Sequence, residues 1–157
     1  MPTKPATTPH PTRRLPPLLR RAWYSLNQTF RQRIAHLGIT PDQYSILRWL
    51  QEGDLRGITQ QTITDLMASD PNTITSILQR MEKVGLVSRH AHESDRRARR
   101  VRIEDTGRRL YTKACEIAVA LQEQIMAVIP AARRSRFLQD LELVANACTT
   151  GEAQPEK

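Results

Sequence analysis

Residues 58–90 read ITQQTITDLMASDPNTITSILQRMEKVGLVSRH, and this stretch decides the fold. Thr59 and Ser69-Asp70-Pro71 are helix-start signals: each offers a polar cap, and Pro71 suits a first helical turn. The first helix is expected to bury Ile63, Leu66 and Met67. The second is expected to end at Gly85 and to bury Ile74, Ile77, Leu78, Met81 and Val84. The pattern therefore predicts two short helices joined by a tight turn.

Two further helices are expected on the N-terminal side of this pair. Thr40 and Gln43 have capping-box spacing around Pro41, which predicts a helix that runs to a turn at Gly53. Before it, apolar residues recur at helical spacing over residues 18–37, and Gly38 is a stop signal. Residues 1–17 hold six of the ten prolines, so they are expected to form a disordered basic arm.

The period of the pattern changes after Gly85. Residues 86–90 and 99–103 are typical of two short strands, with the charged run 92–97 as the turn between them. Apolar spacing then predicts a long helix over 110–128, a break at Pro130, another helix to Cys148 and a frayed tail over 149–157. The expected fold is mainly α with a small β-hairpin wing. A winged helix-turn-helix domain (39–107) is inserted in a helical dimerisation region (18–37 and 108–148).

The charge distribution favours a polyanionic partner. The chain has 24 Lys and Arg against 16 Asp and Glu, a net charge of +8. Residues 1–41 carry +7 and residues 80–109 carry +5, whereas residues 42–79 carry −3. Two basic blocks of this kind are typical of anion-binding surfaces, although solubility alone would also account for them. No apolar run approaches the roughly 18 residues of a membrane span, and no secretory signal is expected, so the protein is expected to be cytoplasmic and without a membrane partner.

Enzyme, metal and disulfide chemistry have little support in the sequence. Cys115 and Cys148 cannot form a disulfide framework and are expected to be buried, inert thiols. His90 and His92 would share a strand face with Cys115 as a distant third ligand, which is a weak metal site. No Gly-rich phosphate loop or catalytic triad pattern occurs. We expect no enzyme activity, no cofactor and no metal.

The second short helix presents a small, hydrogen-bonding face that suits base edges and phosphates. An ordinary solvated face would look the same, so this helix alone leaves both interpretations open. With the preceding helix, the candidate DNA-binding residues are Thr62, Asn72, Thr73, Thr75, Ser76, Gln79 and Arg80.

The hairpin favours the nucleic-acid interpretation. It carries Arg96, Arg97, Arg99, Arg100 and Arg102, which would repel one another unless a polyanion compensates them. Alternation along the strand places Arg100 and Arg102 on one face and Arg99 with Val101 on the other. Only the arginines at the tip are expected to enter a narrow minor groove. Asp95, Arg96 and Arg97 complete the candidate DNA-binding set.

From Ile39 to Leu110 the sequence resembles the MarR (multiple antibiotic resistance regulator) family of transcription factors. The resemblance rests on SDRRARRVRIEDTGRRL, where Asp95 and Arg97 match the family's wing pair, and on the recognition-helix pattern that ends in RMEKVGLVSR. It departs at Glu104, where the family usually has Thr. The resemblance implies a homodimer that binds a pseudo-palindromic double-stranded DNA operator, with recognition helices in major grooves and wings in flanking minor grooves.

The resemblance also implies a repressor that a small ligand releases from DNA, because many family members respond to aromatic acids. Trp23, His36, Tyr44 and Tyr111 would line such a ligand pocket, and each would equally serve as an ordinary core or helix residue. Two alternatives are a non-specific nucleoid or RNA-binding protein and a His/Cys metal-dependent sensor. Neither accounts for both the wing and the recognition helix.

Overall fold

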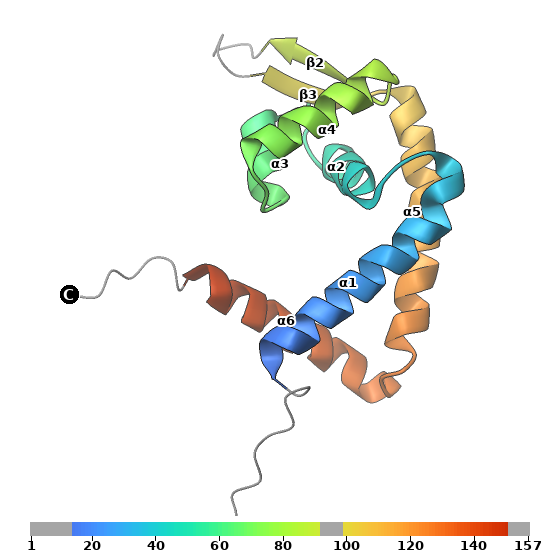
Figure 1. The fold of residues 1–157 in the computed structure, drawn as a ribbon, viewed down its shortest axis with the longest axis vertical. Coiled ribbons are helices and arrows are strands. Elements are labelled where there is room, and N and C mark those ends of the chain that lie inside the picture. The colour runs from blue at the N-terminus through green and yellow to red at the C-terminus, as the bar shows by residue number, and fades with distance from the viewer. Residues whose placement is uncertain (1–13, 92–98, 151–157) are drawn as a thin grey trace, which may run out of the picture. The chain divides into compact units, whose positions relative to one another are not determined.

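The computed structural model describes residues 14–91 and 99–150 and forms two compact units, residues 1–118 and 119–157. The elements run α1 (Leu15–Ile34), η2 (Ala35–Leu37), α2 (Pro41–Glu52), β1 (Ile58–Thr59), α3 (Gln60–Leu66), α4 (Pro71–Lys83), β2 (Val87–Ala91), β3 (Arg99–Ile103), α5 (Asp105–Met126) and α6 (Ala131–Thr150) (Figure 1). This is a mainly helical chain with a small antiparallel sheet. The predicted winged-helix fold class is confirmed.

The helix starts follow from local capping chemistry. α1 begins at Leu15, earlier than the expected start at 18, because Pro16 and Pro17 occupy its first turn, where no backbone N–H is needed. At α2 the predicted capping box is confirmed. The Gln43 amide donates to Thr40 Oγ1 at 3.3 Å, and the Thr40 amide donates to Gln43 Oε1 at 2.9 Å.

The predicted helix pair of residues 59–85 is confirmed as α3 and α4. Thr59 caps α3 by accepting from the Thr62 amide, and Asp70 caps α4 by accepting from the Thr73 amide. α4 buries Ile74, Ile77, Leu78 and Met81 as expected. Val84 and Leu66 were expected to be buried, which is wrong. Val84 is 63% exposed, and Leu66 is exposed too, because each lies at the end of its helix, where the apolar stripe turns out to solvent.

The sheet contains one strand that the sequence pattern did not predict. Its order is β1-β3-β2, so β1 pairs along the free side of β3. The register joins Ile58 to Val101 and Val87 to Ile103. A strand of two residues has no detectable alternation, and only its pairing with β3, some forty residues later, defines it.

The core of the first unit lies beneath α4 and the sheet. α3 and α4 pack side by side, α4 contacts β2, and α2 contacts β3 (Figure 1). Fully buried aliphatic side chains from these elements and from the end of α1 form this core, namely Ile34, Ile46, Leu47, Ile63, Ile74, Leu78, Val87 and Val101. The core thus fixes α4 with its polar face outward.

The two long C-terminal helices were also predicted. α5 begins at Asp105, directly after Glu104, where the sequence departs from the family pattern, and Asp105 suits the positive end of the helix dipole. α6 continues to Thr150, so residues 149 and 150 are helical and not part of a frayed tail. Within the described residues, no single helix has the length and apolar composition to cross a membrane; α5 and α6 meet that test only together, as a bent pair.

Candidate nucleic-acid interface

The outer face of α4 carries most of the predicted DNA-binding residues. Asn72, Thr73, Ser76, Gln79 and Arg80 are exposed along this helix, while its apolar stripe is buried. Thr62 is exposed on α3, and Thr75 is half-buried where α3 and α4 meet. The structure therefore brings this set of residues to one pair of packed helices.

Three threonines of the set also have hydrogen-bonding roles within the fold. The Thr73 amide and hydroxyl both donate to Asp70, and these bonds hold the pKa of Asp70 below its usual value. The Thr75 hydroxyl donates to the Pro71 carbonyl at 2.7 Å and accepts from Gln60 Nε2 at 2.7 Å. The Thr62 and Thr59 hydroxyls lie 2.8 Å apart. Thr75 in particular has already used its only donor.

Asn72, Ser76 and Gln79 differ from these threonines. Their side chains are exposed, and Arg80 Nε donates to the Ser76 carbonyl at 3.2 Å. An exposed amide offers both donors and acceptors, as adenine recognition requires. Within the described residues, these three are the best-placed groups for reading base edges.

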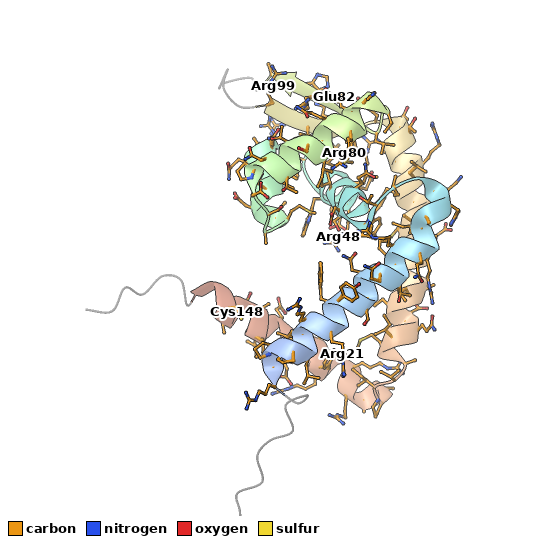
Figure 2. The ribbon with its side chains drawn as sticks, viewed as in Figure 1. Arg21, Arg48, Arg80, Glu82, Arg99 and Cys148 are labelled. Atoms are coloured by element: carbon orange, nitrogen blue, oxygen red, sulfur yellow. The ribbon has the colours of Figure 1, made fainter. Side chains whose placement is uncertain are left out.

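The wing beside α4 is described only at its base. The predicted tip residues Asp95, Arg96 and Arg97 lie outside the described residues. Arg99 is exposed at the start of β3, and Arg80 and Glu82 extend from α4 (Figure 2). Glu82 accepts from Arg89 of β2, at 2.8 Å from Nε and 2.6 Å from Nη2. That bond, with the Arg89 charge, lowers the pKa of Glu82.

The arginine repulsion expected in the hairpin is relieved partly within the protein. Arg89 pairs with Glu82, while Arg100 and Arg102 donate to backbone carbonyls of the segment before β1. Sequence reasoning missed the bonds of Arg100 and Arg102, because their acceptors lie more than forty residues earlier in the chain. A polyanion is therefore not needed to accommodate every arginine of the wing.

The predicted ligand residues divide into two groups. Tyr44 and Tyr111 stack with ring centroids 5.9 Å apart, and Phe30 meets the edge of Tyr44 at 4.9 Å. Trp23 is 64% exposed on α1, and His36 is exposed in η2. The ring contacts of the described residues do not include Trp23. The structure thus brings Tyr44 and Tyr111 together with Phe30.

Two neighbours of this tyrosine pair were missed in the sequence. Burial and the Cys115 thiol raise the pKa of Tyr44. Burial and a hydrogen bond to Cys115 raise the pKa of Tyr111. The positive charge of Arg48 lowers both pKa values in part. Arg48 lies 4.6 Å from the Trp49 ring centroid, and in the described part of the chain its buried Nε has no hydrogen-bond partner. Arg48 follows Tyr44 by four residues and Cys115 follows Tyr111 by four, so helical spacing would have found them.

The two cysteines differ in their exposure. Cys115 is half-buried, but Cys148 is exposed on α6, so its expected burial is wrong for the single chain. Most of α6 is exposed in the same way, which leaves Cys148 without cover. Among the described residues, no group of three or more His, Cys, Asp or Glu side chains is arranged to hold a metal ion. His92 lies outside them.

A polar recognition helix packed on a positioning helix, with a basic hairpin beside them, defines a winged helix-turn-helix protein. The MarR family model matches residues 39–98. Over these residues the chain is similar to the MarR family of transcriptional regulators.

Relatives of known name agree with this assignment. The transcriptional regulator HosA of Escherichia coli is 28% identical over 134 residues, covering 82% of this chain and 98% of HosA. The M. tuberculosis regulator MosR, solved in complex with DNA, is 26% identical with a TM-score of 0.67, covering 83% of this chain and 95% of MosR. CouR from Rhodococcus jostii RHA1, solved with p-coumaroyl-CoA, is 24% identical with a TM-score of 0.78, covering 88% and 96%.

Proposed function

We propose that this protein is a homodimeric, sequence-specific DNA-binding regulator that represses nearby genes from a pseudo-palindromic operator in the cytoplasm. The observation that carries the proposal is the exposed row Asn72, Ser76 and Gln79 on α4, held outward by a fully buried apolar stripe. Two such helices related by a dyad would enter successive major grooves, about one helical turn apart. We expect no catalytic activity.

The wing residues belong to the proposal as predictions. Arg97 would enter a flanking minor groove, Asp95 would hold it there, and Arg96 would contact the backbone beside it. Arg97→Ala should then weaken binding strongly, and Asp95→Ala should weaken it indirectly. The N-terminal arm was predicted over residues 1–17, of which residues 15–17 belong to α1. It would add non-specific affinity through its charge without choosing bases.

Selection of bound duplexes from a random pool, followed by fluorescence anisotropy, tests this function. We expect a single inverted repeat. If the dimer neutralises about six to ten phosphates, affinity should fall by roughly 10³ to 10⁵ between 50 and 200 mM salt. Asn72→Ala should alter the preference at one position per half-site by roughly 1–3 kcal/mol. Lys113→Ala, an exposed residue of α5, is the control.

Equal affinity for all duplexes would contradict the proposal. That result would favour the alternative of a non-specific nucleoid protein, and tighter binding to RNA than to DNA would favour an RNA-binding protein. The exposed amide and hydroxyl groups of α4 favour base reading over both, because backbone binding alone requires only cations.

The proposed homodimer rests on apolar side chains that the single chain leaves exposed. On α1 they are Leu15, Leu18, Leu19, Trp23 and Leu26. In residues 119–148 they are Val119, Ile125, Val128, Phe137, Leu138, Leu141 and Leu143. Exposed apolar surface of this extent usually marks an association site. A second copy of the chain, joined through regions 18–37 and 108–148, would bury it.

The proposed effector is a small aromatic acid bound at the tyrosine pair. Tyr44 and Tyr111 provide stacking surface, and Arg48 adds a cation whose Nε lacks a partner among the described residues. CouR, which shares this fold, was solved with an aromatic acyl thioester. Trp23 and His36 are exposed in the single chain, so they would line the ligand pocket only in the homodimer.

Titration of the DNA complex with 4-hydroxybenzoate tests the effector site. We expect release of the DNA, and Arg48→Gln should abolish release while preserving DNA affinity. Release that is unchanged in Arg48→Gln would place the ligand elsewhere.

A further inference from the structure

The outer face of β3 carries two arginines that bond within the protein. Arg100 and Arg102 share this face, and Val101 between them is fully buried on the other. Arg100 Nη1 donates to the Gly57 carbonyl at 2.6 Å, and Arg102 Nε donates to the Arg56 carbonyl at 2.7 Å. Both acceptors lie in the segment immediately before β1, which we name the 54–57 turn. The two arginines therefore connect the central wing strand to that turn.

The 54–57 turn has a defined conformation of its own. Asp54 accepts from the Arg56 amide at 2.8 Å and from its guanidinium at 3.0 Å, and the Gly57 amide donates to the Asp54 carbonyl at 2.8 Å. These Arg56 bonds lower the pKa of Asp54. Gly57 has φ +91°, and a Cβ there would lie 2.4 Å from the Val101 carbonyl oxygen. The turn thus lies directly against β3 and presents its carbonyls to the two arginines.

The opposite side of the wing is connected to α4. Arg89 of β2 pairs with Glu82 of α4, and the Arg89 side chain is only 18% exposed. The wing strands are therefore bonded at both sides, to the 54–57 turn through β3 and to the recognition helix through β2. The base of the wing is thus bonded to two neighbouring segments of the first unit.

We propose that Arg100 and Arg102 are positioning residues, which hold the wing at the angle DNA binding needs, and do not contact phosphates. This inference rests on the proposed function. The guanidinium groups are directed at carbonyls of the protein, and such charge-assisted bonds are geometrically specific. The wing consequently contributes fewer phosphate contacts than its count of arginines suggests.

The dependence of affinity on salt separates positioning from phosphate contact. Arg100→Gln should lower affinity for the selected operator roughly tenfold. The slope of log K against log salt should stay at its wild-type value, because no phosphate contact is lost. Loss of one contact per subunit would instead reduce that slope by about 1.8 for the dimer. Arg102→Gln should behave alike, and Arg100→Lys, which keeps a donor and the charge, should restore most of the affinity.

Arg99→Gln is the matched control, since it removes an exposed charge from the same strand. Arg100→Gln and Arg102→Gln should lose affinity only on duplexes long enough to include the flanking segments that the wing reaches. On a duplex trimmed to the two half-sites their affinity should match wild type. A reduced salt slope, or an equal loss on both duplexes, would overturn the proposal.

Amide hydrogen exchange tests the same inference without DNA. In Arg100→Gln, exchange should accelerate at residues 58–59 and 99–103, while the melting temperature and the exchange of α2 stay as in the wild type. Unchanged exchange in β1 and β3 would overturn the positioning role, whatever the DNA result. Failure of the wild-type protein to bind any duplex would contradict the proposed function alone, because the exchange result would still decide the role of Arg100.

Discussion

Ala68 and Gly85 occupy equivalent positions after α3 and α4. In each case the second residue after the helix has positive φ, +45° at Ala68 and +71° at Gly85. The bonds are also equivalent: the Ser69 amide donates to the Thr64 carbonyl, and the Leu86 amide donates to the Met81 carbonyl. These are two Schellman caps, and only one has the glycine that this conformation favours. The turn between α3 and α4, the two helices proposed to bind DNA, therefore contains backbone strain at Ala68.

Ala68→Gly is expected to stabilise the protein. Relief of the left-handed strain at Ala68 outweighs the added chain entropy, so the free energy of unfolding should rise by about 0.5–1 kcal/mol. Gly85→Ala is the matched reverse change and should lower it by about 1 kcal/mol; its added Cβ would meet nothing within 4 Å. Urea unfolding measures both. A less stable Ala68→Gly would contradict this account.

Gly57→Ala is expected to cost more than Gly85→Ala. Both positions have positive φ, but at Gly57 the new Cβ would also lie 2.4 Å from the Val101 carbonyl oxygen, so the chain must shift. We expect a loss of roughly 2–4 kcal/mol in the free energy of unfolding, the sum of strain and displacement. The same urea series checks this, and equal losses at the two glycines would show that the close approach relaxes freely.

At the scale of elements, the helices could be predicted and the sheet only in part. The starts of α2, α3 and α4 depend on residues within one turn, such as Thr40 with Gln43 and Asp70 with Thr73, so the sequence states them directly. β1 and the Arg100 and Arg102 bonds depend on partners more than forty residues away. Periodicity contains no information about such partners. The polar face of α4 could be predicted because it depends on residue spacing within the helix. The bonds of Arg100 and Arg102 to backbone carbonyls could not.

The Arg89–Glu82 ion pair, which joins β2 to α4, should make the free energy of unfolding depend on pH. Arg89 lowers the pKa of Glu82 below its ordinary value of 4.5. A lowered folded pKa means that the pair stabilises the fold above about pH 4.5 and that this contribution disappears as the pH falls through the folded pKa. Because Glu82 is partly exposed, the contribution should be only about 0.5–1 kcal/mol.

Glu82→Gln measures that contribution. At pH 7 the variant should unfold more easily than the wild type by this amount, and the difference should disappear as the pH falls through the lowered pKa of Glu82. Asp140→Asn, which removes the exposed i,i+4 partner of Arg136, is the control and should change little. A difference between Glu82→Gln and wild type that does not change with pH would show that packing, not charge, is responsible.

At the scale of the whole molecule, much of the apolar surface of the single chain has no cover. Leu19 of α1 is 37% exposed, and its neighbours on the helix include Leu15, Leu18 and Trp23. Residues 119–148 show the same property in their own unit. The proposed dimer accounts for both surfaces, because apolar burial is the main driving force of permanent association.

Leu19→Glu should therefore produce a monomer. Placing a charge in a buried apolar interface is costly, so sedimentation equilibrium should show one chain in solution, and operator affinity should fall because half-sites are then bound singly. Leu55→Glu is the control for oligomeric state: Leu55 is 86% exposed in the 54–57 turn and should leave the mass unchanged. A dimeric Leu19→Glu variant would move the interface away from α1.

The sequence by itself determined the helices, their caps and the polar face of α4, because capping and amphipathic spacing act within a few residues. It also carried the resemblance that implies a dimeric regulator. Only the tertiary structure decided that Tyr44 and Tyr111 meet while Trp23 stays exposed, and that Arg89, Arg100 and Arg102 bond to the protein itself. These outcomes depend on contacts between distant segments, and such contacts exist only once the core has set the elements against one another.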